Sequence, residues 1–246
     1  MAQLVIDIGN SRTKVAIFID HRLIKTEIFK HFDTDQLKKY LRASDITHSI
    51  ISSVNEEITG LEVLLKEKTS YVRFSAQLKT GIDNRYKTPA TLGLDRFAGV
   101  VAARAIFPGT NCLVIDAGTC ITYDAIDKNG VYEGGSISPG LQMRLKAMHT
   151  FTGRLPLVDF ADFNNWQGYD TISAMLSGVV NGSVAEINGF IEMYNSKYPD
   201  LQVILCGGDA NFFDTRMKSS IFAHTLKTEP DLVLIGLNEV IYQRND

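Results

Sequence analysis

The same local pattern occurs twice in this chain of 246 residues. The first copy, starting at residue 4, reads LVIDIGNSRTKVAIF, and the second, starting at residue 112, reads CLVIDAGTCITYDAI. Each copy is an apolar segment typical of a buried strand, an Asp-x-Gly turn with a hydroxyl residue, and a second apolar segment. The spacing is too long for a solenoid repeat. We therefore predict two related halves, residues 1–110 and 111–246, with a ligand site in the cleft between them.

Hydrophobic patterning predicts that strands alternate with helices in both halves. In the first half we expect strands at 4–8, 14–19, 23–29, 49–54 and 71–74, and helices at about 34–41, 58–65 and 92–107. Asp33 or Thr34 is the expected N-cap of the first helix. Residues 75–89 are polar and aperiodic, which predicts a loop. In the second half we expect strands at 112–115, 121–126, 131–137 and 202–206, and helices at 141–149, 171–198 and 232–243.

Composition excludes several classes of protein. Hydrophobic residues make up 45% of the chain and charged residues 22%, which is typical of a globular protein. The formal net charge is -3, and no basic stripe is visible, so we expect no nucleic-acid partner. No apolar run is long enough to span a membrane, and the N-terminus lacks the basic region of a signal peptide. Cys112, Cys120 and Cys206 match no zinc spacing, and we expect reduced, buried thiols in a cytoplasmic protein.

The first turn of the repeat carries groups suited to binding a polyphosphate. Gly9 allows a sharp turn and a close approach of the backbone to a ligand. Hydroxyl groups and turn amides donate to phosphate oxygens, Lys14 adds a point charge, and Asp7 can hold Mg2+ through water. The segment comprises Asp7, Ile8, Gly9, Asn10, Ser11, Arg12, Thr13 and Lys14. Taken alone, an ordinary hairpin whose Asp and Asn satisfy turn amides explains it equally well.

The second turn, Asp116 to Thr119, repeats this arrangement. A carboxylate after an apolar strand is costly to bury without a partner or a cation. A simple turn again remains an alternative, but the repeat favours two loops that bind one nucleotide's phosphates. Two further glycine-rich segments, 134–140 and 207–209, suit close backbone approach to a ligand or a tight turn. No Walker or GxGxxG motif is present, which argues against a P-loop kinase and a dinucleotide enzyme.

A third candidate is the stretch Gly93, Leu94, Asp95 and Arg96, at the start of a predicted helix. Arg96 can bind a substrate carboxylate in a bidentate manner. Asp95 can accept the proton of a hydroxyl nucleophile, as catalytic carboxylates do in phosphoryl transfer. The alternative is an Asp that interacts with the helix dipole beside an exposed Arg. From these residues alone, that alternative is the better explanation.

Six motifs occur in an order that resembles the type III pantothenate kinase family. They are DIGNSRTK, TPATLGLDRFAG, DAGTCITYD, GGSISPGLQM, GYDTISAMLSG and CGGD, and they extend over nearly the whole chain. GLDR with its TP lead-in and GGSISPGLQM are the most specific. Ser11 stands where the family more often has threonine, and Cys120 where it more often has alanine. Neither departure removes a group that the chemistry needs.

The resemblance implies an α/β protein with a duplicated actin-like (ribonuclease H-like) fold, in which two mixed β-sheets are flanked by helices. It implies a homodimer that transfers the γ-phosphoryl group of ATP to the primary hydroxyl of pantothenate, the first step of coenzyme A synthesis. Asp7 to Lys14 match the phosphate loop, and Gly93 to Arg96 match the pantothenate-binding stretch, with Asp95 as general base. Tyr86 and Thr171 match substrate contacts, Thr119 an ATP contact, and Asp116 a ligand of K+ or NH4+.

Two other functions fit the same scaffold. One is a different enzyme, such as a sugar kinase or an exopolyphosphatase-like hydrolase, because the phosphate loops would serve either reaction. A sugar site, however, needs hydroxyl-binding carboxylates and amides more than the arginine of GLDR. The other is a non-catalytic regulator, against which the intact carboxylates of Asp95 and Asp116 argue. Fold alone does not decide between these functions, so the distinction depends on the site.

Overall fold

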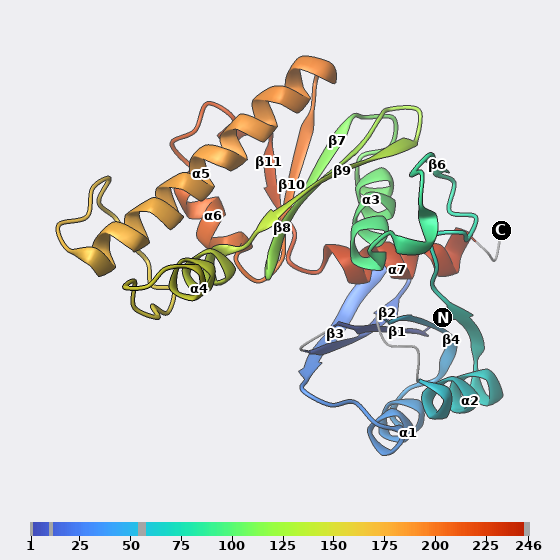
Figure 1. Ribbon diagram of the computed structural model, residues 1–246. Coiled ribbons are helices and arrows are strands. Elements are labelled where there is room, and N and C mark those ends of the chain that lie inside the picture. The colour runs from blue at the N-terminus through green and yellow to red at the C-terminus, as the bar shows by residue number, and fades with distance from the viewer. Residues whose placement is uncertain (1, 10–11, 54–57, 244–246) are drawn as a thin grey trace. The chain divides into compact units, whose positions relative to one another are not determined.

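The computed structural model describes residues 2–9, 12–53 and 58–243, and its chain forms two compact units (Figure 1). The first unit comprises Met1–Pro108, Gly130–Tyr132 and Asp231–Asp246, and the second comprises Gly109–Asn129 and Glu133–Pro230. The first unit therefore includes a helix from the end of the sequence. The two halves that we predicted from the sequence, with a boundary between residues 110 and 111, are defined by their related motifs and not by compactness. That boundary stays a prediction.

The first unit is built on a five-stranded mixed sheet with the order β3-β2-β1-β4-β5. The pairs β1–β2 and β2–β3 are antiparallel, whereas β4 is parallel to both β1 and β5. The strands are β1 (Ala2–Ile8), β2 (Thr13–Ile19), β3 (Arg22–Phe29), β4 (Ile46–Ser53) and β5 (Ser70–Arg73). Each of the predicted strands of this half is confirmed, with ends that differ by a few residues; the predicted end of the fourth strand at residue 54 lies outside the described residues.

Helices lie on both faces of this sheet (Figure 1). On one face α1 (Thr34–Ala43) and α2 (Thr59–Lys68) pack through Leu37 and Leu65 against the apolar side chains of β1 and β2. The α1 helix starts at Asp33, whose side chain accepts hydrogen bonds from the amides of the first turn, as predicted. The other face carries α7 (Leu232–Gln243), which packs against β1, β2 and β4.

The helices α3 (Leu94–Ile106) and α7 are in close contact within the first unit. A Cβ atom at Gly236 of α7 would lie 1.9 Å from the carbonyl oxygen of Ala98, so only glycine allows the two backbones to approach this closely. Two short elements precede α3: β6 (Asp83–Asn84) and a 3-10 turn at Pro89–Thr91. The predicted loop at 75–89 is therefore wrong at these residues, because a two-residue strand leaves no periodic signal in the sequence.

The second unit repeats the strand order of the first. Its sheet has the order β11-β10-β7-β8-β9, with β6 added beyond β9 through a pairing with Val131 and Tyr132 of the first unit. Strand β7 is antiparallel to β8 and parallel to β10, as β1 is to β2 and β4. The strands are β7 (Cys112–Ala117), β8 (Cys120–Ile126), β9 (Val131–Pro139), β10 (Gln202–Cys206) and β11 (Leu226–Thr228). The duplication predicted from the sequence is thus a duplication of topology.

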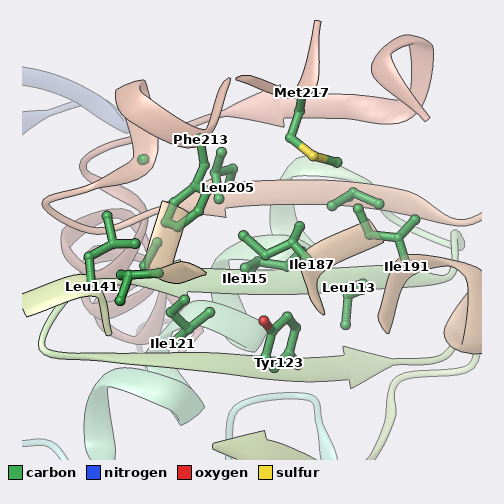
Figure 2. Packing of buried hydrophobic residues seen from close by; sticks show 14 of the residues in the cluster. Leu113, Ile115, Ile121, Tyr123, Leu141, Ile187, Ile191, Leu205, Phe213 and Met217 are labelled. Atoms are coloured by element: carbon green, nitrogen blue, oxygen red, sulfur yellow. The ribbon is translucent and has the colours of Figure 1, made fainter. Parts of the chain in front are cut away.

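The core of the second unit lies between the sheet and its helices (Figure 2). Buried residues of β7 and β8, such as Ile115 and Tyr123, pack against Ile187 and Ile191 of the long helix and Phe213 of α6. The helices are α4 (Leu141–Phe151), α5 (Thr171–Lys197) and α6 (Ala210–Met217), with a 3-10 turn at Ala223–Thr225. In the described part of the chain no helix is long and apolar enough to cross a bilayer. Cys112 and Cys206 are buried as predicted, whereas Cys120 is partly exposed.

Candidate functional site

The carboxylate of Asp7 lies at the end of β1, at the centre of the first cluster of predicted residues. Asp7 pairs with Lys14 across the antiparallel β1–β2 ladder and with Ser52 across the parallel β1–β4 ladder. Burial raises the pKa of Asp7 to about 6; a hydrogen bond from Ser52 opposes this, the negative charge of Asp95 adds to it, and Lys14 opposes it. Lys14 and Asp95 are therefore both close enough to Asp7 to affect its pKa.

Gly9 and Arg12, the described residues on either side of positions 10 and 11, lie close together after β1. The backbone amide of Gly9 donates to the carbonyl oxygen of Arg12, with the two atoms 3.0 Å apart. Arg12 is exposed, whereas Ile8, which belongs to the core, and Thr13 are buried and can offer a ligand little beyond their backbone. The predicted contacts at residues 10 and 11 lie outside the described residues.

The first turn of α3 holds the predicted carboxylate and guanidinium in different environments. Asp95 is exposed, and its Oδ1 accepts a hydrogen bond of 2.8 Å from the backbone amide of Arg96. Gly93, immediately before the helix, touches this carboxylate: a Cβ atom there would lie 2.6 Å from Oδ1. Leu94 is the first residue of the helix. The glycine therefore leaves the space that the carboxylate occupies.

Arg96 is buried, with 7% of its surface exposed. The alternative explanation, which requires an exposed arginine, is therefore wrong on this point. Its Cζ lies 5.7 Å from the centroid of the Tyr86 ring, a cation–π contact. Tyr86 is stacked at 6.2 Å on Tyr132, which in turn lies 6.3 Å from Phe97. An aromatic stack thus holds the guanidinium of a buried arginine beside the exposed Asp95.

A second cluster surrounds Asp116 at the end of β7. The backbone amide of Gly118 donates to the carbonyl oxygen of Cys120 at 2.9 Å, closing the turn. Two other loops reach it: the amide of Gly140 donates to the carbonyl oxygen of Thr119 at 3.0 Å, and the amide of Asp209 donates to that of Ala117 at 2.9 Å. Thr119 itself is exposed. The glycine-rich segments 134–140 and 207–209, which the sequence left open, therefore meet the second repeat turn in one place.

Gly207 is held tightly against this cluster. Its φ of +92° lies in the region that favours glycine, and a Cβ atom there would be 2.3 Å from both Asp116 Oδ1 and the carbonyl oxygen of Ala117. A carboxylate oxygen and a backbone carbonyl oxygen therefore lie close together beside the glycine. Burial raises the pKa of Asp209, which begins the α6 helix next to them. Another predicted residue, Thr171, is exposed at the start of α5, after the capping residue Asp170.

The oxygen atoms of the two clusters fit the predicted cations. Among the described residues no group of three His, Cys, Asp or Glu side chains could hold a metal without help. Mg2+ in phosphoryl-transfer sites needs only one or two carboxylates, with phosphates and water completing the shell. Asp7 suits that arrangement, because it is a carboxylate near the end of a strand whose charged form is disfavoured mainly by burial, and a bound cation would favour that form. At Asp116 the neighbouring carbonyl oxygen of Ala117, which also accepts from the Asp209 amide, would be a second oxygen ligand for the predicted monovalent cation.

Comparison with known proteins gives sequence matches to a single family of kinases. The family model of type III pantothenate kinase matches residues 3–193. Type III pantothenate kinases from Bacteroides fragilis and Christiangramia forsetii are 44% and 42% identical, each covering 97–98% of both chains. A Campylobacter jejuni structure, provisionally assigned to Baf family transcriptional activators, is 23% identical with a TM-score of 0.61 over 98% of each chain. A glucokinase from an Antarctic psychrotroph (10% identity, TM-score 0.54, 98% and 99% coverage) likewise shares the duplicated actin-like fold.

Proposed function

This chain belongs to the type III pantothenate kinase family, and we propose that it transfers the γ-phosphoryl group of ATP to the primary hydroxyl of pantothenate. The product is 4'-phosphopantothenate, the first intermediate of coenzyme A biosynthesis. The observation that carries the proposal is the buried Arg96, which lies against Tyr86 and directly follows the exposed Asp95. Arg96 supplies a group that binds the substrate carboxylate, and Asp95 supplies a base. The two repeat turns alone provide neither. Pantothenate-dependent formation of ADP by the purified chain tests the proposal.

The first repeat turn binds the phosphates in this proposal. Phosphoryl transfer depends on positioning and on neutralising charge more than on covalent chemistry. Lys14 supplies a positive charge next to Asp7, and we propose that amides of the turn after β1 add backbone donors. Asp7 is the residue that would hold Mg2+, directly or through water, and bound Mg2+ would offset the charge of the phosphate oxygens. Asn10, Ser11, Ile8 and Thr13 complete the proposed phosphate-binding segment.

Asp95 accepts the proton of the attacking hydroxyl. Its exposure makes it accessible to a substrate, and the hydrogen bond from the Arg96 amide to Oδ1 fixes the orientation of the carboxylate. A carboxylate in this role needs to lie within hydrogen-bond reach of the hydroxyl, and a rigid first turn of a helix provides that. Gly93 and Leu94 shape the start of this turn.

Arg96 binds the carboxylate of pantothenate. A guanidinium that is fixed by aromatic packing loses little freedom when it binds a carboxylate with two parallel hydrogen bonds. The stacked rings of Tyr86 and Tyr132 restrict the Arg96 side chain in this way. A sugar substrate has no carboxylate for this group, so the environment of Arg96 favours pantothenate over a sugar. Tyr86 is the second contact that we propose for the substrate.

We also propose nucleotide and cation contacts at the second cluster. Thr119 is exposed at the turn after β7, where its hydroxyl can reach ATP, and Asp116 with the Ala117 carbonyl would hold K+ or NH4+. Such a cation would add positive charge to this cluster. From the family resemblance we also propose a homodimer in which Thr171 contacts the substrate. Composition and charge support a cytoplasmic protein without a nucleic-acid or membrane partner.

A further inference from the structure

The carboxylate of Glu186, on α5, joins three elements of the second unit. Its Oε1 accepts hydrogen bonds from Tyr123 on β8 at 2.9 Å and from Ser138 on β9 at 2.5 Å. Its Oε2 accepts one from Nη2 of Arg144 on α4 at 2.6 Å. No motif that we interpreted from the sequence includes Glu186, and none of the proposed roles in the reaction uses it.

Arg144 extends this network to the turn between β9 and α4. Its Nε donates to the carbonyl oxygen of Pro139 at 2.7 Å, and its Nη2 lies 3.3 Å from the hydroxyl of Ser138. The next residue, Gly140, donates its amide to the carbonyl oxygen of Thr119. A Cβ atom at Gly140 would lie 2.1 Å from the carbonyl oxygen of Gly118, so the turn and the loop at 118–119 are in direct backbone contact. The chain of contacts runs from Glu186 to this loop.

The charges in this network are partly buried and depend on each other. The side chains of Arg144 and Glu186 are 21% and 24% exposed. Burial raises the pKa of Glu186, but the hydrogen bonds from Ser138, Arg144 and Tyr123 outweigh it, and the pKa is lowered overall. Removing one partner of such a pair leaves the other charge uncompensated in a poorly solvated place. Arg144 would then turn toward solvent and release the carbonyl oxygen of Pro139.

We propose that Glu186 is a positioning residue for ATP binding, acting through Arg144 and the turn at 138–140 on the loop at Gly118 and Thr119. Glu186 does not touch the nucleotide in this account. The proposal rests on the proposed function in one respect, because it takes Thr119 as an ATP contact. It deepens that function by assigning a role to Glu186 on α5, a residue that does not contact the reacting groups.

The test compares two substitutions that each remove one carboxylate from a contact between α5 and β9. Glu186→Gln keeps the size of the side chain and removes its charge. Glu133→Gln is the matched control, because Glu133 on β9 pairs with Lys197 on α5 at 3.1 Å, with both side chains more than half exposed. For Glu186→Gln we expect KM for ATP to rise by about tenfold, while kcat and KM for pantothenate change by less than about twofold. For Glu133→Gln we expect no change.

A binding measurement separates this inference from the proposed function. Calorimetric titration with a non-hydrolysable ATP analogue, without pantothenate, should show weaker binding to Glu186→Gln than to the unsubstituted chain and Glu133→Gln. If the unsubstituted chain binds the analogue but shows no pantothenate-dependent turnover, the proposed function fails while this comparison still decides the inference. Equal nucleotide binding by all three proteins overturns the inference, and so does a fall in kcat at unchanged KM for ATP.

A second variant covers the case in which Glu186→Gln does not fold. Ser138→Ala removes one donor to the carboxylate and leaves the pair between Glu186 and Arg144 intact. We expect it to fold and to weaken binding of the ATP analogue in the same direction, by a smaller factor. Unchanged binding in folded Ser138→Ala, together with loss of folding in Glu186→Gln, would show that the network serves stability alone and would overturn the inference.

Discussion

Asp7 lies directly opposite Lys14 across the antiparallel pair of β1 and β2. The second repeat has the same geometry, with Asp116 opposite Thr122 across β7 and β8. The two repeats thus share the carboxylate at the strand end but not the lysine that faces it. Opposite residues of an antiparallel pair lie on the same face of the sheet, so the residue facing Asp7 from the next strand is a lysine, whereas the one facing Asp116 is an uncharged threonine.

The raised pKa of Asp7 predicts how the stability of the ligand-free protein depends on pH. The folded protein holds a proton on Asp7 up to about pH 6, whereas the unfolded chain releases it near 3.8. Between these values the folded state binds more protons, so the Asp7 contribution to stability falls as pH rises through this window. Asp7→Asn should therefore resist urea better than the unsubstituted protein at pH 7.5. Its free energy of unfolding should be higher by up to about 3 kcal/mol.

Two comparisons make that prediction specific. The difference between Asp7→Asn and the unsubstituted protein should shrink when unfolding is measured at pH 4.5. Asp45→Asn, which changes an exposed carboxylate just before β4, should behave like the unsubstituted protein at both pH values. If Asp7→Asn is no more stable than Asp45→Asn at pH 7.5, the carboxylate of Asp7 is not in the unfavourable environment described.

The base role of Asp95 predicts a loss of turnover without a loss of structure. Asp95→Asn and Asp95→Ala should reduce kcat by at least about a hundredfold, the lower range for loss of a general base. Because Asp95 is exposed, thermal unfolding should be little changed, and ATP binding should persist. The measurements are steady-state kinetics and calorimetric titration with an ATP analogue. Turnover close to normal in either variant would remove Asp95 from the base role.

The contact between Gly93 and Asp95 predicts a more subtle effect. The Cβ of Gly93→Ala would lie 2.6 Å from Asp95 Oδ1 and would displace the carboxylate from its bond to the Arg96 amide. We expect kcat to fall by about tenfold, since a misplaced general base loses part of its contribution. Gly189→Ala is the control, because Gly189 lies within α5 and no atom lies within 4 Å of its added Cβ. Equal kcat values for the two variants would contradict the described geometry.

The cation assigned to Asp116 predicts a dependence on K+ or NH4+. Activity should be lost when Na+ is the only monovalent cation, and Asp116→Asn should raise the K+ concentration for half-maximal activity by at least about tenfold. Asp200→Asn is a suitable control, because Asp200 is exposed in a turn and has a φ of +57°, which asparagine also adopts readily. Full activity in Na+ alone would count against the assignment.

The sequence predicted the fold well because the repeat is also a repeat of topology. Strand and helix positions followed from apolar periodicity, and Asp33 marked the start of α1 through its capping chemistry. The short strands β6 and β11 were not predicted, because two or three residues paired with distant strands have no local signature. The burial of Arg96 could not be predicted either, since it depends on a stack whose Tyr132 comes from far along the chain.

Parts of the site were visible in the sequence only as separate segments. The glycines at 140 and 207 were equally well explained as tight turns until the structure showed how closely they approach the loop after β7. Glu186 gave no signal, because a single acidic residue in a long helix resembles any solvated charge. The roles of individual site residues and the cleft between the halves remain predictions.

The most direct test of the central claim is an assay of ADP release by the purified chain with Mg2+-ATP and K+, with and without pantothenate. Asp95→Ala serves as the matched blank for contaminating ATPases. We predict ADP release that requires pantothenate, is lost in the blank, and is accompanied by a product with the mass of 4'-phosphopantothenate. ADP release that is independent of pantothenate, or no turnover by a folded sample that binds ATP, would contradict the account.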